Sequence, residues 1–478
     1  MSQVHRWRAF SLLAVSFFMT IVDLAIVNVA LPTIGQKLHF SEANLQWVVT
    51  AYGLTFGGFL LLGGRAADLL GRRRVLMIGL AVFTVASLAC GVATTDSFLI
   101  AMRGVQGLGA AIILPAALSI VMDMFQEGAE RNKALGIWGG IGASGATVGL
   151  IAGGLLTRYA GWEYIFYLNV PIGAAALVLA PRLVPESRLA TVRRRYDPFG
   201  AISVTGGLLL LVYAFSEAPQ VGWGTTRTVV ELAISVALLI AFLVIETRVE
   251  APLMPLGIFR LKTLAGANAV GLLLGGSFFA YIFVGTLYMQ QVLGYSALRT
   301  GLTWLATSLT SVAFAGLSQA LVTRGGPRLV MALGMALIGG GLLWTTQVPV
   351  DGRFWSNLAG PFVITGLGTA FAFIPISIAG LAGVAKHEAG LASGLLNTSQ
   401  QLGGAIGVAV ASTVAASHLK TLSHAGSAPA AALTGGFQWA FWVCGAIALL
   451  AVPVTFLLVR DDEPAEVVEA TLPARQAA

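Results

Sequence analysis

Charged residues are scarce in this sequence. Asp, Glu, Lys and Arg make up 10% of its 478 residues, hydrophobic residues make up 57%, and the mean hydropathy is +0.84. Soluble globular domains carry about 25% charged residues, so that class is excluded. The 28 basic against 21 acidic residues do not indicate nucleic-acid binding, because the basic residues lie in loops between long apolar segments.

Cysteine and histidine are also rare. Cys90 and Cys444 lie alone in separate apolar segments, so neither a disulfide framework nor a cysteine metal site is expected. The five histidines all fall at loops or chain ends, which excludes a buried histidine cluster. No catalytic triad, metal-ligand set or phosphate-binding loop is recognisable either. We therefore predict no enzyme activity, no metal and no cofactor.

The sequence is rich instead in long apolar segments. We count fourteen that approach the roughly 20 residues a helix needs to cross a bilayer, which predicts an all-α integral membrane protein with 14 transmembrane helices. The first continues to about residue 31, too long for a cleaved signal peptide. With both termini in the cytoplasm, 21 of the 28 basic residues lie in cytoplasmic segments and six outside, as the positive-inside rule requires.

The apolar segments also predict a division of the chain. The basic segment 182–198 marks the end of a first group of six, and the loop at 323–328 repeats the position of the loop at 63–74 in a second group. Two groups of six spans leave two of the fourteen over. The predicted domains are an N-terminal six-helix bundle at 1–190, a linker with two inserted transmembrane helices at 191–262, a C-terminal six-helix bundle at 263–460 and a disordered cytoplasmic tail at 461–478.

Two charged residues fall within the predicted spans of the first bundle. Asp23 lies in the middle of the first span, in TIVDLAIVNVALP, where a carboxylate costs roughly 2.5–3.5 kcal/mol on insertion scales and is functional by default. Arg103 opens the fourth span, at a depth that differs from that of Asp23 by roughly 6 Å. The two are therefore candidates for a proton-coupling pair. Alternatively, Asp23 has a structural partner and Arg103 reaches the outer interface.

Glycines form one face of the predicted fifth span, GIWGGIGASGATVGLIAGG. Gly145, Gly149 and Gly153 recur every four residues, and Gly154 follows. Such a flat face lets helices pack closely in lipid, with or without a transport role.

Polar and aromatic residues within other spans are candidates for a substrate cavity. The ninth span has a dense aromatic stretch, which suits flat apolar cations or serves only in packing. The thirteenth opens with LASGLLNTSQQLGGAIG. No acid lies within a span of the second bundle, which disfavours substrates with two positive charges. The candidate cavity residues are Asn28, Gln106, Phe279, Tyr281, Asn397 and Gln401.

The loop between the second and third spans reads GGRAADLLGRRR. Its order G-x-x-x-D-x-x-G-R-R resembles the signature G-x-L-A-D-R-x-G-R-K of the major facilitator superfamily, with Leu69 in place of a basic residue and Ala66 in place of leucine. The fifth span resembles the signature of drug:proton exporters, which ends G-P-x-x-G-G, with Leu150 in place of the proline. The matching loop residues are Gly64, Asp68, Gly71, Arg72 and Arg73.

Together these stretches resemble the 14-spanner drug:proton antiporter subfamily of that superfamily. The resemblance implies the major facilitator fold, with two bundles around a central cavity and alternating access. It also implies proton-driven export of amphipathic drugs or antibiotics. Asp23 would carry the proton with the help of Arg103, and Asp68 would latch its loop against the start of the thirteenth span. The fifth-span glycines would control opening between the bundles.

Two other functions stay open at this point. One is a transporter or facilitator of a specific endogenous metabolite on the same fold, and the other is a membrane sensor that transports nothing. In the favoured interpretation the partners are a lipophilic or cationic small molecule and the lipid bilayer, the proton gradient supplies the energy, and the protein functions as a monomer. The expected location is the bacterial plasma (inner) membrane.

Overall fold

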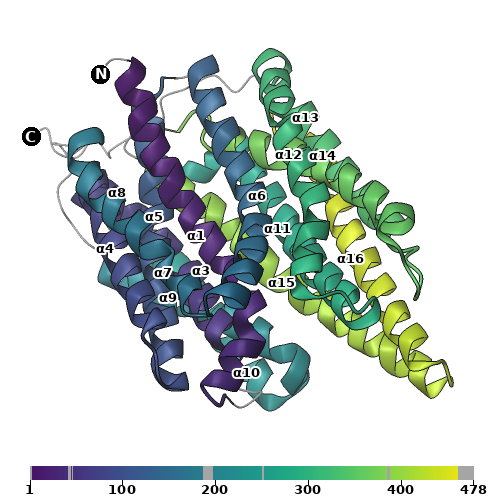
Figure 1. The fold of residues 1–478 in the computed structure, drawn as a ribbon. Coiled ribbons are helices and arrows are strands. Elements are labelled where there is room, and N and C mark those ends of the chain that lie inside the picture. Colours follow the sequence, from purple (N-terminus) through teal and green to yellow (C-terminus); the bar gives the residue numbers. More distant parts are fainter. Residues whose placement is uncertain are drawn as a thin grey trace, which may run out of the picture.

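The computed structural model describes residues 3–40, 45, 47–126, 128–186, 197–249, 252–384 and 388–460. These residues form helices joined by short loops, with no strand among them (Figure 1). In lipid a helix satisfies all of its backbone hydrogen bonds internally, and the long apolar segments follow this rule. The all-α prediction is confirmed.

The first half of the chain forms helices that run back and forth across the molecule. They are α1 (Gln3–Lys37), α3 (Trp47–Leu70), α4 (Arg72–Gly91), α5 (Asp96–Met124), α6 (Ala129–Tyr159), α7 (Tyr164–Tyr167) and α8 (Asn169–Leu183). The inserted pair follows as α9 (Pro198–Val221) and α10 (Thr226–Glu246).

The second half begins after a short 3-10 helix, η1 (Leu256–Arg260). It contains α11 (Lys262–Leu287), η2 (Tyr288–Val292), α12 (Ala297–Gly325), α13 (Pro327–Thr345), η3 (Phe354–Leu358), α14 (Ala359–Ala379), α15 (Ala389–His424) and α16 (Pro429–Leu458). We call the end of the molecule where α1 begins and α3 ends the base. The opposite end, where α1 ends and α5 begins, is the rim.

The described residues test thirteen of the fourteen predicted membrane-spanning helices. Thirteen helical segments among the described residues are long and apolar enough to cross a membrane. The predicted fifth span, α6, is not one of them, although it has 31 residues and packs against α1, α12 and α14. Several side chains in the middle of α6 lie outside the described residues, so its apolar length is not tested. The count of fourteen is therefore not confirmed to the last helix.

The two halves meet along four helix pairings. Helix α6 of the first half packs against α12 and α14, while α3 and α5 pack against α15. The inserted helix α9 pairs with α10 and also contacts α3 and α15. The predicted boundary at 190/191 and the tail at 461–478 lie outside the described residues, so the domain limits stay a prediction.

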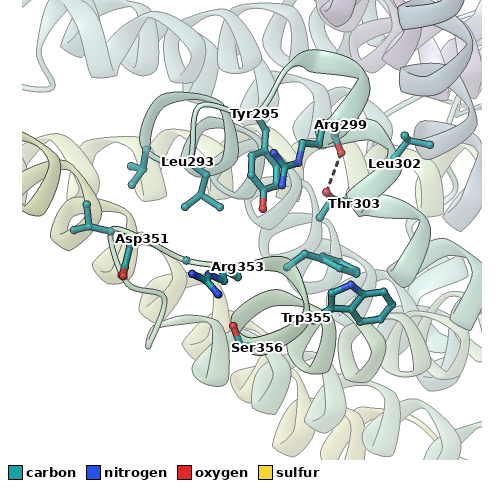
Figure 2. Close-up of a pocket in the computed structure, with 13 residues that line it drawn as sticks. Leu293, Tyr295, Arg299, Leu302, Thr303, Asp351, Arg353, Trp355 and Ser356 are labelled. Atoms are coloured by element: carbon teal, nitrogen blue, oxygen red, sulfur yellow. Dashed lines mark hydrogen bonds between the residues drawn. The ribbon is translucent and has the colours of Figure 1, made fainter.

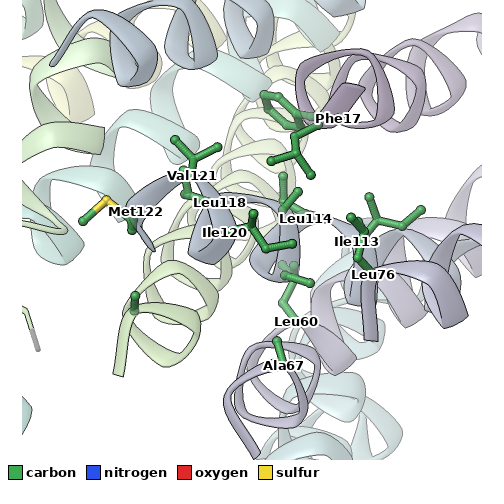
Figure 3. Close-up of a cluster of buried hydrophobic side chains, with 14 of the residues drawn as sticks. Phe17, Leu60, Ala67, Leu76, Ile113, Leu114, Leu118, Ile120, Val121 and Met122 are labelled. Carbon is green, nitrogen blue, oxygen red and sulfur yellow. The ribbon is translucent and has the colours of Figure 1, made fainter. Parts of the chain in front are cut away.

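Each half has its own hydrophobic core. In the first half, buried side chains from α1, α3, α4 and α5 meet around Leu60, Leu76 and Ile113 (Figure 3). A second cluster, around Tyr281, Met335 and Phe441, fills the second half. The first cluster also takes in side chains from the start of α15, so it joins the two halves at the base. The cavity described below lies between the halves.

Candidate functional site

Asp23 and Arg103 form an ion pair inside the first half. The Arg103 Nη1 atom lies 2.6 Å from the Asp23 Oδ2 atom, and both side chains are fully buried. The Arg103 Nε group also donates to the Val48 carbonyl oxygen at 2.9 Å, and its guanidinium lies 4.3 Å from the ring centroid of Tyr52. The sequence placed both residues at similar depth, and the structure shows that they face each other.

Two amides complete the surroundings of the carboxylate. The Asp23 Oδ1 atom accepts from Gln106 at 2.8 Å and from Asn169 at 2.6 Å. Gln106 in turn accepts from Arg103 at 2.7 Å, and the Ser87 hydroxyl accepts from both amides. Buried charges persist only when paired and hydrogen-bonded in this way. The network joins α1, α4, α5 and α8, so a change in the charge of Asp23 is felt by four helices.

Sequence reasoning missed two members of this network. Asn169 stands within the apolar sixth span, and an amide in such a position is a signal that could have identified it. Ser87 gave no comparable signal, because isolated hydroxyls are common in membrane helices.

A cavity of about 200 Å³ lies between the two halves. Helices α1, α3, α5 and α6 line one side, and α11, α14 and α15 line the other. Among the predicted cavity residues, four line it, namely Asn28, Phe279, Asn397 and Gln401. Their contribution to substrate binding stays a prediction.

The other two predicted cavity residues lie elsewhere, and this placement corrects the sequence interpretation. Gln106 points into the first half, because its amide is needed to satisfy the charges of Asp23 and Arg103. Tyr281 is fully buried in the second half, with its ring centroid 4.9 Å from that of Trp304 and 5.6 Å from that of Phe362.

The loop motif ties the two halves together at the base. Asp68 accepts from the backbone N–H groups of Gly390 at 3.3 Å and Leu391 at 3.0 Å, at the start of α15. Arg72 donates to the same carboxylate at 3.2 Å. A side chain at Gly64 would overlap the carbonyl oxygen of Gly390, so the helices approach as closely as glycine allows.

The remaining loop residues shape this contact. Gly71 has φ of 102°, which favours glycine, and it separates α3 from α4. Arg73 reaches Glu186 at 3.5 Å, within the first half. The arrangement agrees with a latch between the halves, a role that stays a prediction.

Most of the fifth-span glycines face α1 of the same half. A Cβ atom on Gly149 would lie 2.7 Å from the Val22 carbonyl oxygen, and Gly145 and Gly153 likewise face α1. Only Gly154, of the four named glycines, faces the second half, at Leu298 of α12. Helix α1 therefore packs against α6 on the glycine face and carries the Asp23 network on another.

A larger pocket of about 1060 Å³ opens at the rim of the second half. Figure 2 shows Arg299 lying over Tyr295 on one side of it, 3.8 Å from the ring centroid, with Arg353 and Trp355 on the other. Asp351 also lines it. Within the described ranges, no group of three His, Cys, Asp or Glu side chains is placed to hold a metal.

Known proteins resemble the chain over nearly its whole length. The puromycin resistance protein pur8 of Streptomyces alboniger is 37% identical over 95% of this chain and 92% of its own. The cephamycin export protein CmcT of Amycolatopsis lactamdurans is 38% identical over 86% and 85%. The tetracenomycin C resistance and export protein of Streptomyces glaucescens is 31% identical over 96% and 93%.

Two solved structures share the fold at low sequence identity. The human organic anion transporter MFSD10 (TETRAN) has a TM-score of 0.69 at 16% identity and covers 95% of this chain and 100% of its own. The proton:xylose symporter XylE has a TM-score of 0.65 at 14% identity over 96% and 97%. The family model described as Major Facilitator Superfamily matches residues 13–408. The chain belongs to the Major Facilitator Superfamily.

Proposed function

We propose that this protein exports small-molecule antibiotics or amphipathic drugs across the bacterial plasma membrane and takes in protons in exchange. Membership of the family makes it a membrane transporter rather than an enzyme. The printed names of relatives concern resistance to, or export of, puromycin, cephamycin and tetracenomycin C. These names support the export of a drug or antibiotic.

The observation that carries proton coupling is the buried Asp23–Arg103 pair. Burial disfavours the charged form of a carboxylic acid and the guanidinium favours it, so a small change around the pair decides whether Asp23 holds a proton. A proton crossing the membrane potential gains roughly 2.3 kcal/mol per 100 mV. Asp23 on α1 gives that proton a site in a helix that also lines the cavity.

Orientation and mechanism follow from the same features. The base carries most of the basic loop residues, so we place it, with both termini, in the cytoplasm. The Asp68 contacts close the base, and their release opens the cavity toward the cytoplasm in an alternating-access cycle. One chain supplies both halves and the cavity, so the working unit is a monomer. The substrate is lipophilic, and the proton gradient is the sole energy source.

Transport by purified protein in lipid vesicles tests the proposal. Lipophilic neutral and cationic compounds are added one at a time under an imposed pH gradient, and proton release is followed. Asp23→Asn should lose proton-driven export yet keep exchange of substrate for substrate, which moves no proton. Asp351→Asn removes a carboxylate at the rim pocket and should behave as wild type. Export by Asp23→Asn at the wild-type rate under a pH gradient would contradict the proposal.

A further inference from the structure

The central cavity contains no charged residue. Its twenty lining residues include six aromatic side chains, four amides and one serine hydroxyl, and the others are aliphatic or glycine. A buried ion needs a counter-charge or full hydrogen bonding to offset the loss of water. This lining supplies no carboxylate for a cationic substrate.

Two of the amides are free to bind a ligand. The side-chain amides of Gln400 and Gln401 make no hydrogen bond to another residue in the described part of the chain. Asn28 and Asn397 donate to carbonyl oxygens of their own helices, at 3.2 Å and 2.9 Å, and keep their amide oxygens as acceptors. An amide offers both a donor and an acceptor, which matches the hydroxyl, carbonyl or amide groups of an uncharged compound.

The nearest carboxylate within the membrane does not serve the cavity. Asp23 lies on the face of α1 that contacts α5 and α8, whereas Leu24, Ala25 and Asn28 line the cavity. Arg103 also neutralises Asp23 at 2.6 Å. When Asp23 takes up a proton, the pair carries a net positive charge, which repels a cation further.

The aromatic residues do not compensate for the missing charge. Phe17 stacks on Trp138 with ring centroids 4.3 Å apart, so these two rings cover each other on one face. Phe278 and Phe373 meet edge to face at 5.4 Å. Cation–π attraction is weaker than a direct ion pair. These walls are better suited to stacking against a flat, uncharged ring system.

The rim pocket has charged side chains, but it too lacks a net negative charge. Arg299 and Arg353 outnumber Asp351 in its lining, and neither arginine forms an ion pair with another described residue. Neither pocket therefore presents a net negative charge to a cation.

We infer that the cavity selects uncharged amphipathic compounds that combine a planar aromatic part with hydrogen-bonding groups, and that it discriminates against cations of the same shape. This inference rests on the proposed function, since it names the substrate class of the same cavity. The charge of the substrate also determines the net charge that crosses the membrane in each transport cycle. Export of a neutral compound leaves each incoming proton uncompensated, so an interior-negative potential alone should drive it.

A matched pair of fluorescent probes tests the selectivity. One is a coumarin carboxamide with a 3,3-dimethylbutyl arm, and the other carries the trimethylammonium arm of the same shape. Binding to the full chain in lipid nanodiscs is measured by anisotropy, with empty nanodiscs as the blank for partition into lipid. The neutral probe should bind at least about tenfold more tightly than the cationic one.

Variants of one cavity amide sharpen this test. Gln401→Glu places a carboxylate in the cavity and should raise affinity for the cationic probe by about tenfold or more, with a fall for the neutral probe. Gln290→Glu makes the same change at an exposed position in η2 and should leave both affinities unchanged. If Gln401→Glu does not fold, Gln400→Glu takes its place. The ratio of the two probe affinities for the wild-type protein tests the inference without either variant.

The outcomes separate the inference from the proposed function. Equal affinities, tighter binding of the cationic probe or no saturable binding of either probe would overturn the inference and leave proton-coupled export standing. Selective binding of the neutral probe supports it. If that probe binds but neither a pH gradient nor a membrane potential drives its export in vesicles, the selectivity stands and the proposed function fails.

Discussion

Asp23 in α1 and Tyr281 in α11 each lie in the first long helix of their half, and both are fully buried. Asp23 is surrounded by a guanidinium and two amides. Tyr281 is surrounded by the rings of Trp304, Phe362 and Phe441. The first long helix of one half therefore buries an ionic network, and that of the other half buries a neutral aromatic cluster.

The same contrast extends over each whole half. Among the described residues of the first half, five charged side chains are buried, whereas residues 263–458 bury none in their described part. The buried charges of the first half are Asp23, Asp68, Arg72, Arg103 and Arg131. Of the two halves, only the first buries charged side chains among the described residues, and the second half lines the cavity with neutral ones.

Removal of one partner from the ionic network should have the largest effect on stability. Arg103→Met leaves Asp23 buried without a counter-charge and should lower the free energy of unfolding by about 3–5 kcal/mol. The double variant Asp23→Asn with Arg103→Met should recover much of this loss, because no isolated charge remains. Chemical denaturation in detergent measures both. A single variant as stable as wild type would show that the network is not the basis of the contrast.

Disruption of the close contact between α1 and α6 in the first half should give the next largest effect. A Cβ atom on Gly149 would lie 2.7 Å from the Val22 carbonyl oxygen and 2.9 Å from the Ala25 Cβ atom. Gly149→Ala should therefore separate α1 from α6 and cost about 1–3 kcal/mol.

A matched substitution in the second half provides the control. A side chain at Gly340 in α13 would meet no atom within 4 Å, so Gly340→Ala should not destabilise, since alanine favours a helix more than glycine does. The two are compared by thermal unfolding. Equal losses would mean that helix flexibility, and not the contact with α1, decides the result.

The sequence predicted the helices better than it predicted which way they face. Hydropathy and loop charge determine where helices begin and on which side loops lie, and residue depth brought Asp23 and Arg103 within reach. Rotation about the helix axis depends on packing between distant segments. Phe279 and Tyr281 are two residues apart, which places them on opposite faces of α11. The aromatic run alone could not distinguish these faces, so both residues were predicted to line the cavity. Of the two, only Phe279 lines the cavity.

Loss of the Asp68 carboxylate should shift conformation more than stability. Asp68→Asn keeps an acceptor for the N–H groups of Gly390 and Leu391 but removes the charge near the start of α15, worth about 1 kcal/mol. Buried Arg72 also loses a partner at 3.2 Å but keeps Asp123 at 3.7 Å, so it is not left without a counter-charge. The base should therefore open about fivefold more often. Distances between spin labels on the base ends of α3 and α15 report this, with Asp351→Asn as control. An unchanged distance distribution would remove Asp68 from the latch.

Removal of the Tyr281 hydroxyl should have the smallest effect and tests the neutral half directly. This hydroxyl lies near those of Thr307 and Thr365 but forms no hydrogen bond of good geometry with them. Tyr281→Phe should therefore change the free energy of unfolding by less than about 0.5 kcal/mol and leave transport intact. The matched change in the first half is Tyr52→Phe. Tyr52 donates to the Thr20 carbonyl oxygen at 3.2 Å, so its loss should cost about 0.5–1.5 kcal/mol.

Unfolding and export are measured together for both tyrosine variants, because the two readouts separate packing from chemistry. If Tyr281→Phe folds as wild type but loses export, the second half contains a working polar group and the contrast between the halves fails. If Tyr52→Phe alone weakens export, the hydroxyl next to the Asp23–Arg103 network matters for more than stability. Tyr52, whose ring lies 4.3 Å from the guanidinium of Arg103, would then be a member of the Asp23–Arg103 network.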